Sequence, residues 1–322
     1  MHSRLDPADE SGLPPYVKGA IITVGTFDGV HRGHRDVIER LVARSQALKI
    51  PSVLITFEPH PLEVVNPSAA PLLLTTDYEK LEVLAETGLD YVAVLPFTSE
   101  LAAYGAEDFV ELILRRRFRL RELLIGYDHG FGRQRAGNVD VLRTIGERDG
   151  FRVEVVDPVT TPDGHSVSST SIRRAIAGGD LERAFAGLGR LYSVSGRVVE
   201  GSQRGHTIGF PTLNLGAPPS RKLLPPEGVY AVRVQTPGGP VGGMMNLGPR
   251  PTFGDSATSL EAHLFDTSGD FYGAHVRIDF VMRLRETRKF AGVEQLTRQL
   301  RHDERDARRA LTLLQLPGNL KG

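Results

Sequence analysis

The stretch AIITVGTFDGVHRGH, residues 20–34, decides the fold of the first half of the chain. Its apolar run, Ala20 to Val24, predicts a buried strand, and the amphipathic segment from Val37 to Val42 predicts a helix after it. A glycine-rich turn between strand and helix is typical of sites where backbone N–H groups and a helix dipole bind phosphate. His31 and His34 are three residues apart, so both can face one side of the first helical turn. A plain turn with two surface histidines remains the alternative.

The composition limits the class of protein. The chain has 322 residues, enough for two domains, and its 39 Lys and Arg balance its 39 Asp and Glu. Zero net charge argues against a nucleic-acid binder, whose surface would be basic. The absence of cysteine excludes disulfides, thiolate metal sites and a cysteine nucleophile. No apolar run approaches a membrane span, and residues 1–15 lack the apolar core of a signal peptide. We therefore expect a cytoplasmic protein.

Apolar runs and helical patterns alternate through residues 1–187. Further strands are predicted at 51–57, 90–95, 123–125 and 151–156, and helices at 36–48, 77–86, 106–118 and 139–148. This alternation predicts an α/β fold with a parallel, Rossmann-like sheet. Polar or glycine-rich segments follow the first four predicted strands, at 25–34, 58–61, 96–98 and 126–132. Because ligands bind at the carboxyl ends of parallel strands, we expect the site at that edge of the sheet.

A second candidate anion site lies in SVSSTSIRRAIAGGD, residues 166–180. Ser169 or Thr170 suits a helix N-cap, and Arg173 then falls in the first turn of the helix. Hydroxyls, backbone N–H groups and a guanidinium together suit a triphosphate, although an ordinary capped helix fits as well. The basic run RRRFRLR, residues 115–121, is interpreted as the end of a helix, where the dipole favours cations, rather than as a nucleic-acid site.

Residues 188–322 show a different periodicity. Short β-like runs separated by Gly- and Pro-rich connections predict a small antiparallel β-barrel, with strands near 192–199, 212–215, 229–235, 242–247, 260–265 and 276–282. A helix is predicted from Val293 to Leu314. We place the domain boundary between residues 187 and 188.

Two segments of the predicted barrel carry chemistry. Thr212 and Asn214 face the same side of a strand, where a hydroxyl and an amide oxygen can serve a Mg²⁺–phosphate group. Glu261, in LEAHLFD, lies on the face opposite the apolar Leu260 and Ala262 and is a candidate base if that face lines a cavity. The alternative for Thr212 and Asn214 is a polar strand face in contact with water. The alternative for Glu261 is an exposed strand residue.

The motifs GTFDGVHRGH, TFEPHP, GYDHGFG and SSTSIR, in this order, resemble the adenylyltransferase module of prokaryotic bifunctional riboflavin kinases/FMN adenylyltransferases, or FAD synthetases. The resemblance implies adenylylation of FMN by ATP with release of pyrophosphate. The FMN phosphate is already an anion, so this reaction needs hydrogen-bond donors and Mg²⁺ rather than a general base. By resemblance, the catalytic residues are His31, His34 and Arg173, the ATP-binding residues are Gly25, Phe27, Asp28, Gly29, Ser169, Thr170 and Arg173, and the flavin-binding residues are Phe57, Pro59, His60, Asp128, Phe131 and Gly132.

The second half resembles the riboflavin kinase module of the same family through GFPTLNL, PPEGVYAV, NLGPRPTFG, LEAHLFD, GDFYG and LRETRKF. The resemblance implies phosphorylation of riboflavin to FMN with ATP. Riboflavin offers a neutral primary alcohol, so a carboxylate that takes its proton is useful. The resemblance makes Glu261 that base, assigns Mg²⁺ and ATP phosphates to Thr212 and Asn214, and adds Gly205 and Gly209 in a phosphate-covering loop. The chain departs from common family residues at His129, Gly130, Asn138, His206 and Leu213.

The expected partners are riboflavin, FMN and ATP, without nucleic acid or membrane. Two alternatives remain open on the sequence. The chain could be an adenylyltransferase whose barrel only binds flavin, or a regulator that binds flavin or RNA. Zero net charge argues against the RNA-binding version.

Overall fold

The computed structural model describes residues 12–127, 137–161, 164–201, 208–249, 258–267 and 269–315. The chain forms two compact units, and the boundary between them in the sequence follows Ser169. Two helices, α7 (Ser169–Ala177) and α8 (Leu181–Leu188), precede the barrel strands, and α8 contacts the last of them. The boundary after residue 187 remains a prediction from the sequence.

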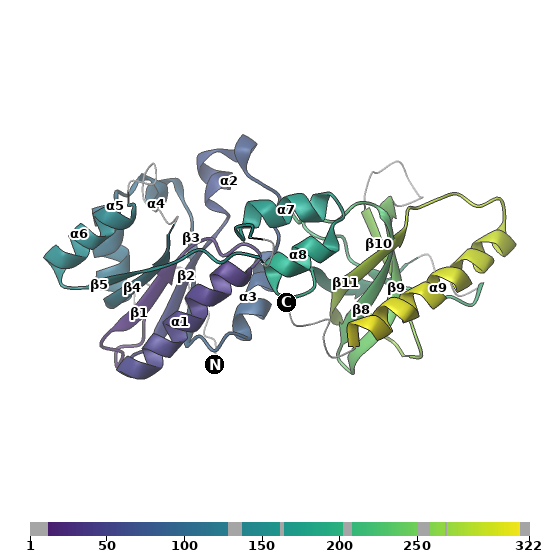
Figure 1. Ribbon diagram of the computed structural model, residues 1–322, viewed down its shortest axis with the longest axis horizontal. Coiled ribbons are helices and arrows are strands. Elements are labelled where there is room, and N and C mark those ends of the chain that lie inside the picture. Colours follow the sequence, from purple (N-terminus) through teal and green to yellow (C-terminus); the bar gives the residue numbers. More distant parts are fainter. Residues whose placement is uncertain are drawn as a thin grey trace. The chain divides into compact units, whose positions relative to one another are not determined.

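The first unit is built on a five-stranded parallel sheet with the strand order β3-β2-β1-β4-β5 (Figure 1). Its strands are β1 (Ala20–Val24), β2 (Ser52–Glu58), β3 (Tyr91–Pro96), β4 (Leu120–Gly126) and β5 (Arg152–Val156). Its helical segments are α1 (Arg32–Leu48), α2 (Pro61–Val65), the 3₁₀ turn η1 (Pro67–Ala69), α3 (Asp77–Ala85), α4 (Ser99–Ala103), α5 (Ala106–Asp108), the π-helix η2 (Phe109–Arg117) and α6 (Val139–Asp149). The predicted α/β fold is confirmed.

Helices cover both faces of this sheet because its central strands are apolar on both sides. On one face Ile21 and Leu54 pack with Ile38 and Leu41 of α1. The other face packs against η2 and α6 through alternate strand residues, including Ile22. The basic run at 115–121 begins in the last turn of η2, as expected from the sequence, and three of its arginines bond to Glu111, to Asp149 and to main-chain carbonyls before β1.

Strand β4 begins at Leu120, three residues before the predicted run, and Glu122 explains the difference. Its side chain is 12% exposed, and each carboxylate oxygen accepts a 2.8 Å hydrogen bond from the Arg44 guanidinium of α1. The hydrogen bond from Arg44 lowers the pKa of Glu122, and burial acts in the opposite direction. A charged residue can therefore occupy a buried strand whose apolar pattern it interrupts.

We expect Glu122→Gln to destabilise the first unit by about 1–2 kcal/mol at pH 7, because the Arg44 guanidinium loses a charged partner. A carboxyl whose folded-state pKa is depressed stabilises the protein above its unfolded pKa, about 4.3, and loses that contribution as pH falls through the folded value. The difference in melting temperature between wild type and variant should therefore shrink between pH 5 and pH 3. Glu107→Gln, at an exposed ion pair with Arg148, is the matched control and should have little effect. A difference in melting temperature between wild type and Glu122→Gln that stays the same from pH 5 to pH 3 would contradict this account.

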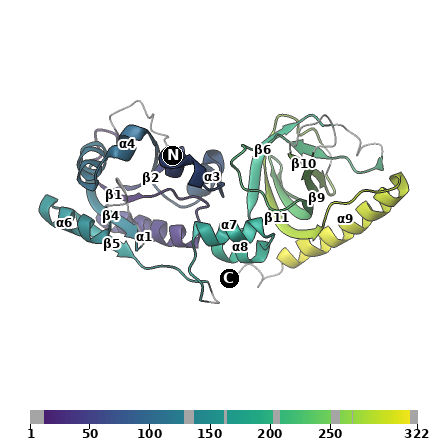
Figure 2. The ribbon, with the colours of Figure 1, turned by 90° about the horizontal axis from the view of Figure 1, so that it is seen from above.

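The second unit is a closed antiparallel barrel with the strand order β10-β7-β6-β11-β8-β9. Its strands are β6 (Ser193–Val199), β7 (Leu213–Leu215), β8 (Gly228–Thr236), β9 (Gly239–Pro249), β10 (Thr258–Leu264) and β11 (His275–Arg285). The helix α9 (Val293–Gln315) lies along the outside of the barrel (Figure 2), where Ala307 and Ala310 pack with Met244 and Phe265. The predicted barrel and C-terminal helix are confirmed. Among the described residues, no helix is long and apolar enough to cross a membrane.

Candidate active sites

The turn after β1 is held in place by Asp28, whose side chain is buried. Its carboxylate accepts hydrogen bonds from the backbone N–H of Leu74 at 3.1 Å and of Thr75 at 3.0 Å. The N–H of Gly29 donates to the hydroxyl of Thr75 at 3.0 Å. These bonds join two segments 46 residues apart and fix the shape of the turn. A contact between Asp28 and ATP remains a prediction.

Two residues without glycine's freedom adopt positive φ angles in this turn. Phe27 has φ 47° and Val30 has φ 38°, on either side of Asp28 and Gly29. Such backbone angles cost roughly 1–3 kcal/mol each, and they persist where surrounding contacts over-determine them, often at binding sites. Gly25 leaves room for the Phe27 ring, since a Cβ there would lie 3.1 Å from it. The strain favours a functional turn over a plain strand–helix connection.

His31 and His34 stack at the start of α1. Their ring centroids are 3.6 Å apart and their planes differ by 15°. His31 is the N-cap of α1, and its Nδ1 accepts a 3.3 Å hydrogen bond from the backbone N–H of His34. Because Nδ1 accepts, the neutral ring carries its proton on Nε2 and can donate from that atom. Gly33 makes this fold-back possible, since a Cβ there would lie 3.3 Å from the His31 ring.

Helix α7 carries the second predicted anion element. It begins at Ser169, so Ser169 and Thr170 lie in its first turn and do not cap it as predicted. The Ser169 hydroxyl instead donates a 2.9 Å hydrogen bond to the carbonyl of Asp28. Thr170 and Arg173 follow in the same helix but belong to the second unit. Their grouping with the two histidines remains a prediction.

Two arginines beside the histidines were missed by the sequence reasoning. Nη1 of Arg32 and Nε of Arg35, both in the first turn of α1, are buried and find no hydrogen-bond partner among the described residues. Such donors at a helix N-terminus suit an anion. Their position directly after the glycine-rich turn is the sequence signal that could have identified them.

The predicted flavin residues of β2 lie at the same carboxyl edge. Phe57 is buried and packs edge-on against Phe97, with centroids 5.4 Å apart. Pro59 follows β2, and His60 is the N-cap of α2, where its Nδ1 accepts a 3.2 Å hydrogen bond from Leu62. Asp128, Phe131 and Gly132 lie outside the described residues, as do His129 and Gly130. Asn138, one of the departures from the family, caps α6 by accepting a hydrogen bond from Val141.

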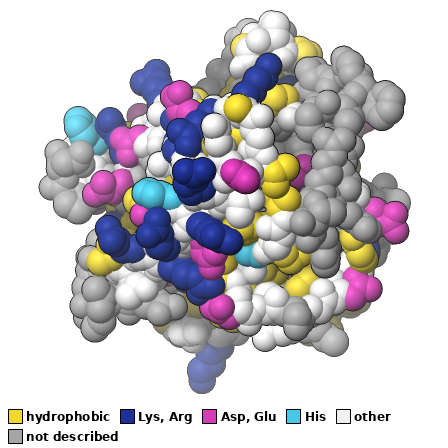
Figure 3. Space-filling model, turned by 90° about the vertical axis from the view of Figure 1, so that its right-hand side faces the viewer, with side chains coloured by type: hydrophobic (Ala, Val, Ile, Leu, Met, Phe, Trp, Pro, Cys, Tyr) yellow, Lys and Arg dark blue, Asp and Glu magenta, His cyan; other side chains and the backbone are white. Residues whose placement is uncertain are grey.

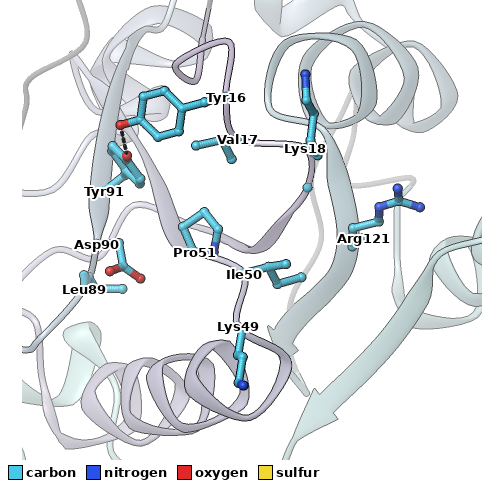
Figure 4. Close-up of a pocket in the computed structure, with 11 residues that line it drawn as sticks. Tyr16, Val17, Lys18, Lys49, Ile50, Pro51, Leu89, Asp90, Tyr91 and Arg121 are labelled. Carbon is cyan, nitrogen blue, oxygen red and sulfur yellow. Dashed lines mark hydrogen bonds between the residues drawn. The ribbon is translucent and has the colours of Figure 1, made fainter.

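A pocket of about 680 Å³ lies at the opposite, amino edge of the sheet (Figure 4). Tyr16 and Tyr91 line it, with their hydroxyl oxygens 3.5 Å apart, and this contact, with partial burial, raises the pKa of Tyr91 to about 12. The Asp90 carboxylate accepts hydrogen bonds from the backbone N–H and from the hydroxyl of Ser52. No predicted site residue lines this pocket, and the strand ends that bind ligands in parallel sheets are at the other edge.

A row of three polar residues crosses the barrel at Glu261. In the strand register, Glu261 of β10 pairs with Asn214 of β7 on one side and with Asn246 of β9 on the other. Directly paired residues have Cβ atoms roughly 4.5–5.5 Å apart, so the three side chains lie on one face. Asn214 is buried, Glu261 is half-buried and Asn246 is exposed. The structure therefore brings together Glu261 and Asn214, two residues assigned to the barrel site, and adds Asn246, the first residue of the NLGPRPTFG motif.

Two small residues, Ser259 and Gly201, contact side chains of this row. The Ser259 hydroxyl, in a residue that is 6% exposed, donates a 2.9 Å hydrogen bond to Oε1 of Glu261. Its spacing of two residues from Glu261 on one strand is the signal by which sequence reasoning could have found it. Gly201 lies against the carboxamide of Asn214, and any side chain at position 201 would collide with that group. Asn214 is thus confined between its strand neighbours and the Gly201 backbone.

We expect Ser259→Ala to lower the kcat of phosphorylation at the barrel site ten- to a hundredfold, since hydrogen bonds to charged groups contribute about 1.5–3 kcal/mol. KM for the alcohol should change little, because the expected effect of the serine is on the orientation of the Glu261 carboxylate, to which it hydrogen-bonds. Ser259→Thr, which keeps the hydroxyl, should restore most of the rate. An unchanged kcat in Ser259→Ala would show that this hydrogen bond does not position Glu261.

The remaining predicted kinase residues are only partly described. Thr212 is half-buried and immediately precedes β7, and Gly209 is exposed with φ 80°. Gly205 and His206 lie outside the described residues. Thr212 and Asn214 offer hard neutral oxygens, which fit Mg²⁺ when nucleotide phosphates supply further ligands. Among the described residues, no group of three or more His, Asp or Glu side chains could hold a metal ion by itself.

The fold and the two sites define a class: a nucleotide-binding α/β unit of the nucleotidyltransferase type joined to a barrel with a carboxylate site. Residues 13–171 match the family model described as FAD synthetase, and residues 188–311 match the model described as riboflavin kinase. The bifunctional riboflavin kinase/FMN adenylyltransferase of Escherichia coli (strain K12) is 38% identical over 292 residues, covering 90% of this chain and 92% of that protein. The protein of the same name from Bacillus subtilis (strain 168) is 33% identical, covering 89% and 91%. The chain belongs to the family of bifunctional riboflavin kinases/FMN adenylyltransferases.

One solved structure matches nearly the whole chain. It is described as a macrolide-efflux protein from Streptococcus pneumoniae and has a TM-score of 0.81 and 29% sequence identity. The match covers 96% of this chain and 98% of that one. The same two-part fold therefore occurs in that protein.

Proposed function

We propose that this chain carries out both reactions named for its family. The barrel unit phosphorylates riboflavin to FMN with ATP, and the α/β unit transfers AMP from a second ATP to FMN, giving FAD and pyrophosphate. The observation that supports this most is the presence of two chemically different sites in one chain. A stacked histidine pair stands at a strained phosphate-type turn, and a carboxylate stands between two carboxamides on the barrel.

The α/β site suits adenylyl transfer because it offers hydrogen-bond donors, and this reaction needs no general base. The nucleophile is the phosphate oxygen of FMN, which is already ionised at neutral pH, and pyrophosphate leaves from the α-phosphorus of ATP. Nε2 of His31 donates a hydrogen bond to the phosphate oxygens, on which charge accumulates in the transition state. Arg32 and Arg35 add positive charge at the same helix terminus, and Ser169 holds the turn. Thr170 and Arg173 bind the departing phosphates.

The barrel site suits phosphoryl transfer to an alcohol. The Ser259 hydroxyl donates to Oε1 of Glu261, so Oε2 is the oxygen that accepts the proton of the riboflavin hydroxyl. The riboflavin oxygen attacks the γ-phosphorus of ATP, the bond from that phosphorus to the β–γ bridging oxygen breaks, and ADP leaves. Asn246 lies beside the carboxylate and orients the hydroxyl. Thr212 and Asn214 hold Mg²⁺ together with the nucleotide phosphates. When bound, Mg²⁺ neutralises the negative charge of the phosphates during transfer.

The test is product analysis of the pure protein. With riboflavin, Mg²⁺ and ATP, chromatography should show FMN first and FAD after it, and with FMN and ATP it should show FAD and pyrophosphate. If added FMN is converted while riboflavin is not, the barrel is no kinase and the single-activity alternative is correct. Omission of Mg²⁺ should abolish both products. Action in the cytoplasm remains a prediction from the sequence.

A further inference from the structure

Helix α9 presents a row of arginines that the two proposed reactions do not use. Arg298, Arg301, Arg305 and Arg309 are all exposed. With 3.6 residues per turn they fall within an arc of about 80° and extend over about 16 Å of the helix. The opposite side of α9 carries Ala307 and Ala310, which pack on the barrel. Figure 3 faces the side of Figure 1 on which α9 lies, and Lys and Arg side chains gather there.

These four residues, the arginine row, have no carboxylate partner within the described residues. Three of the acidic residues of α9 pair with other cations, whereas Glu294, in its first turn, lies on the side of the arginine row. Asp303 binds Arg285 at 2.7 Å, Glu304 binds Arg308 at 2.9 Å, and Asp306 binds His302 at 2.9 Å. Arg308 also binds Asp266. The helix thus neutralises its other cations and leaves the row charged.

The arginine row is unfavourable for the isolated helix. Arg301, Arg305 and Arg309 follow one another at spacings of four residues, and like charges at this spacing repel and destabilise a helix. The helix dipole does not compensate, because it favours cations in the last turn, which contains none. A bound anionic surface would remove this repulsion.

We propose that the arginine row docks an acidic helix of a partner protein. Glutamate or aspartate at every fourth position recurs about every 6 Å along a helix, which is the spacing of Arg301, Arg305 and Arg309. Guanidinium groups bind carboxylates through two parallel hydrogen bonds, and arginine is enriched in protein interfaces. The surrounding charge is consistent with attraction of acidic partners, since residues 170–322 contain 21 Lys and Arg against 14 Asp and Glu.

Other polyanions fit the surface less well. Glu294 lies on the face of the arginine row, and a phosphate backbone has no cation to offer its carboxylate, whereas a protein surface carries charges of both signs. Residues 1–169 contain 25 Asp and Glu against 18 Lys and Arg, which disfavours a long nucleic acid along the chain. A lipid surface is disfavoured because amphipathic helices bind membranes through their apolar face, and that face of α9 packs on the barrel.

The probe is a fluorescein-labelled helical peptide with glutamate at every fourth position, titrated with the full chain at low ionic strength. We expect binding that weakens with added salt. A variant with Arg298→Gln, Arg301→Gln, Arg305→Gln and Arg309→Gln should bind at least tenfold more weakly. The matched control removes four exposed cations of the first unit, by Lys18→Gln, Lys49→Gln, Arg121→Gln and Arg143→Gln, and should bind like wild type. Both variants should keep both enzymatic activities, which shows that they fold.

Several outcomes would overturn the proposal. No binding by wild type, or equal loss in the control variant, would show that the arginine row is only a solvated face. Tighter binding of a single-stranded oligonucleotide with the same number of charges would assign the surface to nucleic acid. Sedimentation that reveals self-association lost in the row variant, without peptide binding, would assign it to a second copy of the chain.

Discussion

Glu261→Gln should reduce FMN formation from riboflavin by about 10²–10⁴-fold, the usual contribution of a positioned general base. Glutamine has the same shape, and its carbonyl oxygen can still accept the Ser259 hydrogen bond that now reaches Oε1. The barrel should therefore keep its structure and lose only the proton acceptor. Conversion of added FMN to FAD should stay at the wild-type rate, because it depends on the other unit. Both rates can be measured on one preparation by chromatography of the flavins.

The matched control for this variant is Glu286→Gln. Glu286 is 84% exposed and contacts Arg283 only at 4.0 Å, so its loss removes the same charge from the second unit without touching the polar row. Its kinase rate should equal that of wild type. Should Glu261→Gln retain riboflavin kinase activity, the base is another residue. Should it lose both activities, the two sites do not work independently.

Replacing His31 and His34 together by alanine should have the reverse effect. Loss of one transition-state donor typically costs about 10²–10³-fold in kcat, and we expect at least this loss in FAD formation from FMN. Phosphorylation of riboflavin should continue, so FMN should accumulate in place of FAD. The direct readouts are FMN accumulation and pyrophosphate release.

His31 also caps α1, so its alanine variant could fail for a structural reason. A helix N-cap contributes about 1 kcal/mol, and asparagine is a good substitute as a cap. His31→Asn therefore keeps an acceptor for the N–H of His34 while it removes the Nε2 donor. This variant should melt like wild type and still lose adenylyl transfer. His165→Ala, at an exposed position of the same unit, controls for the loss of an imidazole. If His31→Asn kept the wild-type rate of adenylyl transfer, the imidazole would serve only as a cap.

Much of the fold follows from local patterns in the sequence. Ala20 to Val24 is apolar at every position except Thr23, and the strand that it forms is buried on both faces. The alternation of such runs with helices allows few parallel topologies, and it places the polar segments after the strands at one edge. In the barrel, the alternation of Leu260 and Ala262 with Glu261 determined which side of β10 is apolar. These signals are carried by residues near one another in the chain.

The tertiary structure decided what depends on residues far apart in the chain. Asp28 shapes the phosphate-type turn through Leu74 and Thr75, 46 or 47 residues away, and Glu122 extends β4 through Arg44, 78 residues away. Strand register placed Asn246 next to Glu261. A one-residue shift in that pairing would have moved every side chain to the other face. Sequence periodicity specifies which face of an element is apolar, but the partners of its polar face are set by how the elements pack.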